Sequence, residues 1–587
     1  MRATNLQVSK ILWIVFLCLL SIPFLNCSTN GSSGAGAPLA PNISQSFGQQ
    51  VLSKIDLNNM LFSSKNLKIF ESSNFYPGIR TDEGHRQFVL GFPTHNIVRV
   101  TAYEWALTLS NSCVPISATD YSNCMTMFKN GLEQSRLYLD QLTNYNKTKI
   151  LMVDIFRVPN WLSSHPSTAP GCFGGLLGEV YRPKDYLVWQ QVLATLVEFI
   201  KSVNAEAKGT QIYYQFWNEP EQACNWKEGT AELLQLYSQT APYIKSIHPS
   251  AKIGGPGSES WTGIVDKDVN TRPQNLVLDF IQFSVEQNLP LDFITFHYFS
   301  SDYRGELIDG VTKTREFQAK LGIQEANQPI IINEWLPQDN APSGYNPFQA
   351  ADGANFYLAL DKINISGQGG VDWQDYGNAP EDAWGIVGFD PVVKKPLFYV
   401  YKFFDELSRT SLGINHWSED INSNLPDSAT PTKFKIGERS FIISKEKENA
   451  CYKLGTWNRL GDSADASIAY LLSAGMLMVD FQSAYGTDPV IMKAKLISAI
   501  KNSKAPTSKW DEAFKNAKFI LTEIDSIRSS KEYNYEVSFS GLKISSASGM
   551  SHARKDIYAQ SKIIRVENDT IKLSLFSEEV SFLNICF

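Results

Sequence analysis

The stretch that decides the fold is QIYYQFWNEP, residues 211–220. Seven residues rich in aromatic and branched side chains precede Asn218, Glu219 and Pro220, a pattern typical of a buried strand that ends at the proline. A second stretch, PIIINEW at 329–335, has the same form and carries Glu334. In a parallel barrel the carboxyl ends of all strands meet on one face, where active sites are built. The two stretches therefore predict two glutamates in one cleft.

Strand-like and helical patterns alternate from residue 66 to about residue 409, which is typical of repeated βα units. Strands are expected at 96–100, 150–156, 211–217, 252–255, 292–297, 329–335 and 370–373, and helices at 185–203, 231–247, 276–287, 315–321, 350–363 and 395–407. We predict an α/β fold, a (β/α)8 barrel over residues 49–410, in which Glu219 follows the fourth strand and Glu334 lies in the seventh.

The pattern changes beyond residue 410. Short alternating strands are expected at 433–436, 439–443, 468–472, 535–539, 571–575 and 580–583. They indicate a C-terminal antiparallel β-sandwich over residues 411–587. Residues 489–516 have a helical pattern and are predicted to be an insertion in it. A structural role is expected for this domain, with carbohydrate binding as the alternative.

Composition excludes some classes of partner. The chain has 587 residues, too many for one core, so at least two domains are expected. Its net charge of −7 and its lack of a Lys/Arg cluster argue against nucleic acid, whose phosphates require a basic surface. Aromatic residues make up 12% of the chain. Their rings can stack on the apolar faces of sugars, although most are expected in the core.

The N-terminus resembles an export signal. Arg2 and Lys10 precede an apolar run at 11–20, which is too short to span a bilayer. We therefore expect a signal peptide over residues 1–27 and an exported protein at the cell envelope.

Residues 24–27, Phe-Leu-Asn-Cys, resemble a relaxed bacterial lipobox, although Phe24 and Asn26 depart from the usual pattern. Lipidation of Cys27 and attachment to a bacterial membrane are expected, with plain secretion as the alternative. Residues 28–48, rich in Ser, Gly, Ala, Asn and Pro, would form a flexible tether.

Six of the eight cysteines remain when Cys18 in the signal and Cys27 are set aside. An even number in an exported protein favours disulfides. Proximity along the chain suggests the pairs Cys113–Cys124, Cys172–Cys224 and Cys451–Cys586. The spacings contain no C-x-x-C and the histidines do not cluster with the cysteines, so no metal site is expected.

The sequences Trp217-Asn218-Glu219-Pro220 and Ile332-Asn333-Glu334-Trp335 resemble the acid/base and nucleophile strands of the clan A retaining glycoside hydrolases. Within that clan the chain is most similar to family 39, the β-xylosidase and α-L-iduronidase family. The resemblance covers most of residues 90–410 in outline and is specific at the two glutamate strands. It implies that Glu219 is the acid/base and Glu334 the nucleophile, with no cofactor. It does not carry over xylose or iduronate specificity.

The same resemblance implies further substrate-binding residues. Asn218 would bond the sugar 2-hydroxyl, and Arg99 would pair with the nucleophile and keep it ionised. Local backbone bonding of the asparagine and a surface position of the arginine are the alternatives. Family 39 usually has a histidine two residues after the arginine, whereas this chain has Thr101.

Three more positions complete the expected site. His297 and Tyr298 follow the sixth strand where family 39 shows His-His-Tyr, and Tyr298 is the expected contact of Glu334. A buried structural histidine is the alternative reading of His297. Trp373 matches the tryptophan that floors the subsite of the non-reducing sugar.

The sequence as a whole predicts an exported, lipid-anchored retaining O-glycoside hydrolase that acts on an oligo- or polysaccharide. One alternative is a catalytically inactive, glycan-binding surface adhesin, although both glutamates are present. Another is an endo-glycanase of clan A family 5, 30 or 51. The oligomeric state and the sugar are left open.

Overall fold

The computed structural model describes residues 51–55, 96–100, 102–117, 119–144, 148–171, 175–261, 275–299, 307–336, 347–360, 362–363, 365–370, 372–374, 385–387, 395–424, 433–447, 451–460, 463–486, 489–529, 533–539, 546–552, 560–562, 565–567, 570–575 and 580–586. The chain divides into two compact units. The barrel unit comprises residues 66–349 and 356–410, and the C-terminal unit comprises the residues before 66, 350–355 and 411–587.

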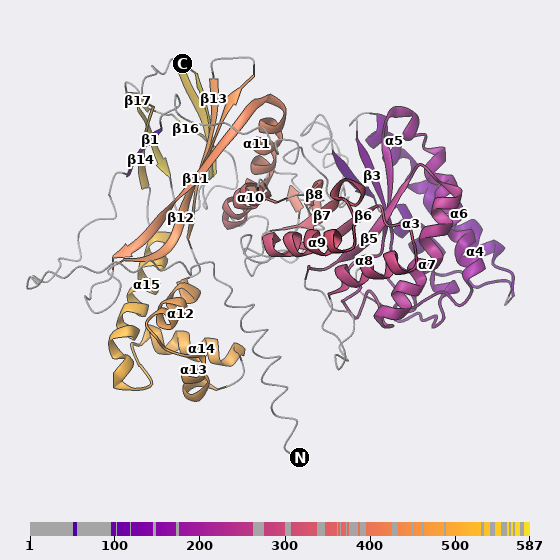
Figure 1. Cartoon of the computed structure of the whole chain (residues 1–587), viewed down its shortest axis with the longest axis horizontal. Coiled ribbons are helices and arrows are strands. Elements are labelled where there is room, and N and C mark those ends of the chain that lie inside the picture. Colours follow the sequence, from indigo (N-terminus) through magenta and orange to yellow (C-terminus); the bar gives the residue numbers. More distant parts are fainter. Residues whose placement is uncertain are drawn as a thin grey trace, which may run out of the picture. The chain divides into compact units, whose positions relative to one another are not determined.

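The barrel unit is built on a parallel sheet of seven described strands (Figure 1). In order these are β2 (Ile97–Val100), β3 (Ile150–Ile155), β4 (Gln211–Phe216), β5 (Lys252–Ser258), β6 (Phe293–Tyr298), β7 (Ile330–Trp335) and β8 (Gly367–Gly370). A side chain at Gly367 would collide with Ile97, so the two outer strands pack together and the sheet is nearly closed. The predicted barrel is confirmed. Glu219 follows the third described strand and Glu334 lies in the sixth, so their places as fourth and seventh stay a prediction.

Side chains inside the barrel change from apolar to polar along the strands. A buried cluster near the start of the strands consists of Ile97, Met152, Tyr213, Phe293 and Ile331. Successive side chains of a strand point to opposite faces, so the residues two positions further on point inward again. These are all polar and buried: Arg99, Asp154, Gln215, Thr295 and Asn333. The apolar layer therefore supports a polar layer directly beneath the carboxyl ends of the strands.

Helices cover the outside of this sheet (Figure 1). They are α3 (Ala102–Ser110), α4 (Ser122–Gln134), α5 (Arg136–Asn144), α6 (Tyr186–Ser202), α7 (Thr230–Ile247), α8 (Leu276–Glu286), α9 (Ile308–Lys320), α10 (Pro347–Leu360) and α11 (Pro396–Thr410). The helix α6 shows why these segments fold as predicted. The side chain of Asp185 caps its start by accepting from Leu187 N at 2.8 Å, and the predicted apolar stripe is buried.

The C-terminal unit contains two sheets. A six-stranded antiparallel sheet has the order β11 (Ser411–Asn424), β12 (Lys433–Glu446), β13 (Cys451–Leu460), β19 (Val580–Cys586), β15 (Ser546–His552) and β16 (Gln560–Lys562). A four-stranded sheet has the order β1 (Val51–Ile55), β14 (Tyr533–Phe539), β18 (Thr570–Leu575) and β17 (Arg565–Glu567). The predicted antiparallel sandwich is confirmed.

The strand β1 departs from the expectation that residues from 49 onward form the barrel. It pairs in parallel with β14, from Val51 opposite Tyr535 to Ile55 opposite Phe539, and so lies in the C-terminal unit. Five residues of alternating pattern do not reveal which distant strand will be their partner.

The helical insertion is larger than predicted. It consists of α12 (Ser463–Ser473), α13 (Met478–Tyr485), α14 (Pro489–Lys501) and α15 (Asp511–Ser529), which share one apolar core. The predicted strand at 468–472 is wrong, because this run lies within α12. A short apolar run fits a buried helix as well as a strand, and here Tyr470 and Leu471 are buried against the neighbouring helices.

Two of the three predicted disulfides are confirmed. Cys113 and Cys124 are joined in the barrel unit, and Cys451 and Cys586 join β13 to β19. Cys224 is also disulfide-bonded, but its expected partner Cys172 lies outside the described residues. Among the described helices, none combines the length and the apolar character required to cross a bilayer.

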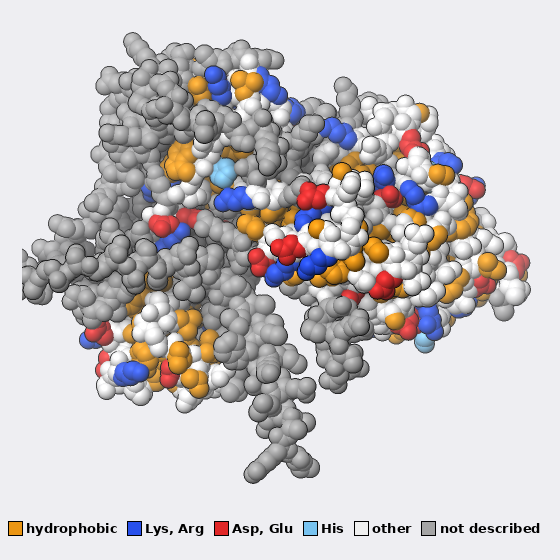
Figure 2. All heavy atoms as spheres, in the orientation of Figure 1, with side chains coloured by type: hydrophobic (Ala, Val, Ile, Leu, Met, Phe, Trp, Pro, Cys, Tyr) orange, Lys and Arg blue, Asp and Glu red, His pale blue; other side chains and the backbone are white. Residues whose placement is uncertain are grey.

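The face of the barrel unit shown in Figure 2 carries interspersed acidic and basic side chains. Among the described residues of this face, Lys and Arg side chains form no continuous basic patch of the kind that phosphate backbones require.

Candidate active site

Glu219 stands at the end of β4 in an unusual backbone conformation. Its φ is 45° and that of Trp217 is 65°, both in the left-handed region that non-glycine residues rarely adopt. The Glu219 N–H donates to Gly257 O at 2.7 Å, and Trp217 Nε1 donates to Asn225 O at 3.1 Å. Neighbouring segments therefore hold this strained turn in place, a feature that clusters at functional sites.

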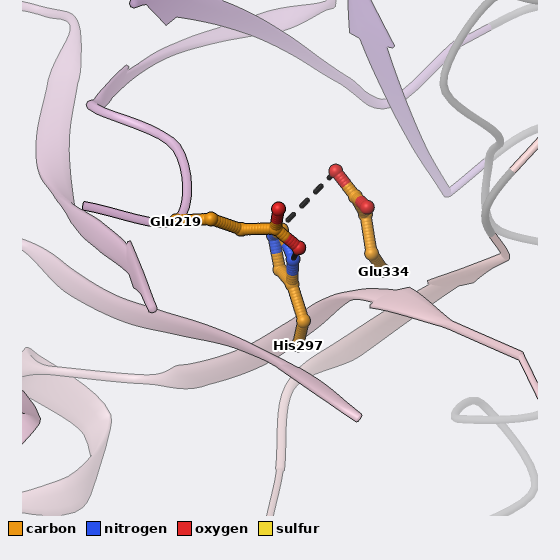
Figure 3. A group of neighbouring side chains, drawn as sticks. All are labelled: Glu219, His297 and Glu334. Carbon is orange, nitrogen blue, oxygen red and sulfur yellow. Dashed lines mark hydrogen bonds and ion pairs between the residues drawn. The ribbon is translucent and has the colours of Figure 1, made fainter. Parts of the chain in front are cut away.

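Glu334 lies in β7 and faces His297 of the adjacent strand β6, its register partner. Figure 3 shows the three side chains together, with the His297 imidazole overlapped by the Glu219 carboxylate and Glu334 beside them. His297 Nδ1 lies 2.9 Å from Glu219 Oε1, and His297 Nε2 lies 3.5 Å from Glu334 Oε1. One carboxylate oxygen of each glutamate and a nitrogen of His297 all lie within 4.8 Å of one another. The structure thus brings together the two glutamates that the sequence predicted.

Arg99 binds Glu334, the predicted nucleophile. Its Nη1 donates to Glu334 Oε1, its Nη2 donates to Asn218 Oδ1 at 2.6 Å, and its Nε donates to Asp154 Oδ2 at 2.5 Å. The arginine is 1% exposed. A guanidinium stays charged in proteins and presents a rigid fork of donors, so Glu334 has a permanent cation as its partner.

A pair of amides braces the two glutamate strands. Asn333 Nδ2 donates to Gln215 Oε1 at 2.8 Å, which joins β7 to β4 directly beneath the carboxylates. Gln215 Nε2 also donates to Trp217 O at 3.2 Å. Both side chains are buried, so these bonds fix the distance between the strands that carry Glu219 and Glu334.

Neutral donors and further carboxylates surround Glu219, the predicted acid/base. Gln222 Nε2 donates to Glu219 Oε2 at 3.1 Å. Glu221 accepts from Ser258 Oγ and, at 3.2 Å, from Glu259 N. Burial raises the pKa of Glu221 to about 7. Burial also raises the pKa of Glu259, as does the nearby charge of Glu219.

Two other buried groups have perturbed pKa values. Burial opposes the charged form of His297, but Glu334 and then Glu219 outweigh it, so the pKa of His297 is raised above its usual value. Burial raises the pKa of Asp154 to about 7, against the opposing effect of Arg99. Perturbed pKa values of this kind are typical of catalytic sites.

Most of the predicted site residues meet here. Arg99 contacts Glu334, His297 contacts both glutamates, and Asn218 joins the group through its bond with Arg99. Tyr298 does not: strand alternation points it to the opposite face from His297, and its ring packs on Phe356 with centroids 6.2 Å apart. The predicted contact between Tyr298 and Glu334 is therefore not seen.

Two predicted positions cannot be placed. Trp373 lies in the short strand β9 (Asp372–Gln374), which pairs with β10 (Gly385–Val387), but its side chain is outside the described residues. Cys27 also lies outside them.

The sequence-based prediction missed Asp154, Gln215 and Gln222. Two of them had a signal: Asp154 is the one polar residue of β3, and Gln215 interrupts the aromatic run of β4 at an inward position. A buried polar residue in such a place needs a partner, which in a barrel lies on a neighbouring strand or at the active site. Gln222 follows the strand in a loop and had no such signal.

Oxygen and nitrogen atoms of Glu219, His297 and Glu334 lie close enough to surround a cation. The Arg99 guanidinium already lies on Glu334, and Glu219 already bonds His297, so each carboxylate has a partner within the protein.

Comparisons with known proteins agree with this geometry. A family model, glycosyl hydrolases family 39, matches residues 158–433. A β-xylosidase of Geobacillus stearothermophilus is 32% identical over 130 residues, which are 21% of this chain and 23% of that protein. A β-xylosidase of Caldicellulosiruptor saccharolyticus is 26% identical over 177 residues, 29% of this chain and 34% of that protein. The aligned parts thus span well under half of these relatives.

Solved structures show a similar fold. A family 39 enzyme of Xanthomonas axonopodis pv. citri has a TM-score of 0.54 and 13% identity, covering 93% of this chain and 99% of that one. A family 39 β-xylosidase of Caulobacter crescentus has a TM-score of 0.50 and 12% identity, covering 92% and 100%. Together with the family model, these matches confirm the resemblance to glycoside hydrolase family 39 of clan A that the two glutamate strands predicted.

Proposed function

We propose that this family 39-like protein is a retaining O-glycoside hydrolase with Glu334 as nucleophile and Glu219 as acid/base. One observation carries the proposal: the two glutamates have oxygens within 4.8 Å of each other and opposite kinds of partner. Retaining enzymes hold their carboxyl groups about 5–5.5 Å apart, whereas inverting enzymes leave about 6.5–9.5 Å for a water molecule. The close approach of the two carboxylates here therefore fits the retaining arrangement better than the inverting one.

In the first half-reaction, a Glu334 oxygen attacks the anomeric carbon and the glycosidic bond breaks. Arg99 keeps Glu334 ionised for this attack, because its charge stabilises the carboxylate. Glu219 gives a proton to the departing oxygen, and Glu334 becomes neutral as it forms the glycosyl ester. Asn218, which accepts from Arg99 Nη2, is held where its amide can bond a sugar hydroxyl.

In the second half-reaction, Glu219 takes a proton from a water molecule, which attacks the same carbon and releases Glu334 as a carboxylate. His297 contributes to both steps. It lies 2.9 Å from Glu219, and its raised pKa lets the pair hold one proton between them. The proton can rest on the imidazole and move to Glu219 when the leaving group is in place.

The substrate class that this site fits is a glycoside of a neutral sugar or an oligosaccharide. Carboxylates of Glu219, Glu221 and Glu259 gather on the acid/base side, and they would repel an anionic leaving group. Because the curated relatives are named β-xylosidases, an aryl β-xyloside is the first substrate to test.

The deciding experiment is hydrolysis of a panel of aryl glycosides by the chain from residue 31 onward, beside Glu219→Gln and Glu334→Gln. Glu512→Gln, an exposed glutamate in α15, is the matched control. We expect both active-site variants to lose at least about 10³-fold in kcat/KM and the control to lose nothing. Azide should restore only Glu219→Gln, and the first product should keep the anomeric configuration of the substrate.

Two results would contradict the proposal. Inverted product would exclude Glu334 as a covalent nucleophile. Glycan binding without turnover, unchanged in both variants, would favour the adhesin instead, although an adhesin has no need of two carboxylates with a buried arginine and histidine between them.

The same proposal places the enzyme at the cell envelope, exported by residues 1–27 and anchored through lipidated Cys27. The support is the sequence pattern alone. Fatty-acid labelling of the full chain tests it: label in the wild type that disappears in Cys27→Ser supports the anchor, and unlabelled, released protein supports plain secretion.

A further inference from the structure

Asp154 is a buried carboxyl group that the mechanism above does not use. Its Oδ2 accepts from Arg99 Nε at 2.5 Å, while Arg99 Nη1 donates to Glu334. Asp154 and Arg99 are each 1% exposed. Two carboxyl groups on strands β3 and β7 therefore share one guanidinium on β2.

We propose that Asp154 is a positioning residue that divides the charge of Arg99 with the nucleophile, so that its protonation state decides which half-reaction is faster. This inference rests on the proposed function. An ionised Asp154 takes part of the Arg99 charge away from Glu334, and a protonated Asp154 leaves that charge to Glu334.

The surroundings of Asp154 let it change its protonation state. Its second oxygen, Oδ1, is buried and has no hydrogen-bond partner. The charged groups that face it are Arg99 on β2, Glu104 on α3 and Glu334 on β7. Burial raises the pKa of Asp154, Arg99 opposes the rise, and the charges of Glu104 and Glu334 add to it, which brings the pKa to about 7.

The two half-reactions respond to Asp154 in opposite ways. During attack Glu334 loses its negative charge to the new bond with the anomeric carbon, so a less stabilised carboxylate attacks faster. During release the bond between Glu334 and that carbon breaks and the carboxylate regains its charge, so an undivided Arg99 favours this step. Once Glu334 is an ester it no longer repels an ionised Asp154, so the pKa of Asp154 falls in the intermediate.

The test compares the two steps across pH in the wild type and in Asp154→Asn. The amide keeps an acceptor for Arg99 Nε but cannot ionise. The probes are an activated aryl glycoside, whose kcat reports release, and a glycoside with a poor leaving group, whose kcat/KM reports attack. The acid and base roles of Glu219 make the ratio of attack to release depend on pH in both proteins, so the comparison is between their two pH profiles. Relative to Asp154→Asn, attack in the wild type should gain on release by about tenfold between pH 6 and 8, as for one unit of pKa. Identical pH profiles of this ratio in the two proteins would contradict the inference.

Two further variants accompany Asp154→Asn: one controls for the loss of a buried carboxylate, and the other tests the predicted shift of the midpoint. Asp405→Asn removes another buried carboxylate that is paired with an arginine, Arg409 on α11, and should leave the ratio unchanged. Glu104→Gln removes the charge that faces Asp154 from α3 and should shift the midpoint to lower pH. A uniform loss at every pH in Asp154→Asn, with the midpoint unmoved in Glu104→Gln, would overturn the inference.

An infrared titration separates this inference from the proposed function. The titration is done in a Glu221→Gln background, because Glu221 also has a pKa of about 7. A buried carboxylic acid band that vanishes around neutral pH in that background, and is missing when Asp154→Asn is added, supports titration of Asp154 even if no glycoside is cleaved. Absence of that change would overturn the inference while leaving the hydrolase activity intact.

Discussion

The two glutamates proposed as catalytic both contact His297, yet their surroundings differ in kind. Glu334 lies against Arg99, whose charge is permanent, and that arginine is held by two further acceptors. Glu219 lies against His297 and Gln222, of which the first gains and loses protons and the second is neutral. A nucleophile must stay ionised and an acid/base must exchange protons. The difference in partners therefore supports the proposed roles of Glu334 as nucleophile and Glu219 as acid/base.

The largest loss of activity should follow substitution of Arg99, the permanently charged partner of Glu334. Arg99→Lys keeps the charge but loses the fork that reaches three acceptors at once. We expect kcat/KM to fall by about 10²–10³-fold in steady-state assays, comparable to losing an electrostatic donor at a reacting centre. Arg315→Lys, which changes an arginine that donates to Gln328 O away from the site, is the control. An Arg99→Lys enzyme with full activity would show that charge alone suffices.

The next largest loss of activity should follow substitution of His297, the partner of Glu219 that can gain and lose a proton. His297→Gln keeps a polar side chain but cannot take up a proton. We expect kcat/KM for poor leaving groups to fall by about 10²-fold, as for loss of acid–base assistance, and much less for activated leaving groups. His248→Gln removes another buried histidine, which bonds Tyr214 and Glu206, and controls for packing. Equal losses with both kinds of leaving group would assign His297 a structural role instead.

His297 also makes stability depend on pH. Its pKa is raised in the folded state, so the stabilisation is full below the unfolded pKa and is lost as pH rises through the folded value. Thermal melts of the wild type should therefore lose part of their stability above neutral pH, and His297→Gln should lose less. A larger pH-dependent loss in the variant would contradict the sign of this shift.

A smaller effect is expected at Gln222. Its amide is a neutral donor to Glu219 Oε2, and one such bond is worth about 1 kcal/mol, or roughly fivefold in rate. Gln222→Ala should therefore lower kcat by about fivefold in steady-state assays. An unchanged kcat would show that this bond contributes nothing to the reaction.

The smallest effect on turnover is expected at Glu221, which contacts neither reacting group directly. Its pKa is raised to about 7, so it stabilises the fold at low pH and this contribution is lost as pH rises toward 7. In Glu221→Gln the free energy of unfolding should fall less between pH 5 and 8, by about 1–3 kcal/mol. Exposed Glu512→Gln should keep the slope of the wild type.

The sequence predicted the parts of this site that leave a local trace. Each of the two glutamates is followed within three residues by a proline, Pro220 and Pro337, and the helical spacing of 185–203 matches α6 closely. The role of Asp154 left only a weak trace, because its partner Arg99 lies 55 residues earlier and meets it only when β2 pairs with β3. The error at 468–472 has the opposite cause: the local pattern was clear, but it fits two structures equally well until its neighbours are known.

The pairing of β1 with β14 has a consequence for how the molecule is made. Residues 51–55 emerge from synthesis more than 470 residues before the strand they dock against, residues 533–539. The C-terminal unit is therefore assembled from segments on both sides of the barrel unit in the chain. A fragment that begins after residue 55 would leave one edge of β14 without its hydrogen-bonding neighbour, open to strands of other molecules. A C-terminal fragment made by dividing the protein at residue 410 would therefore have this exposed edge of β14.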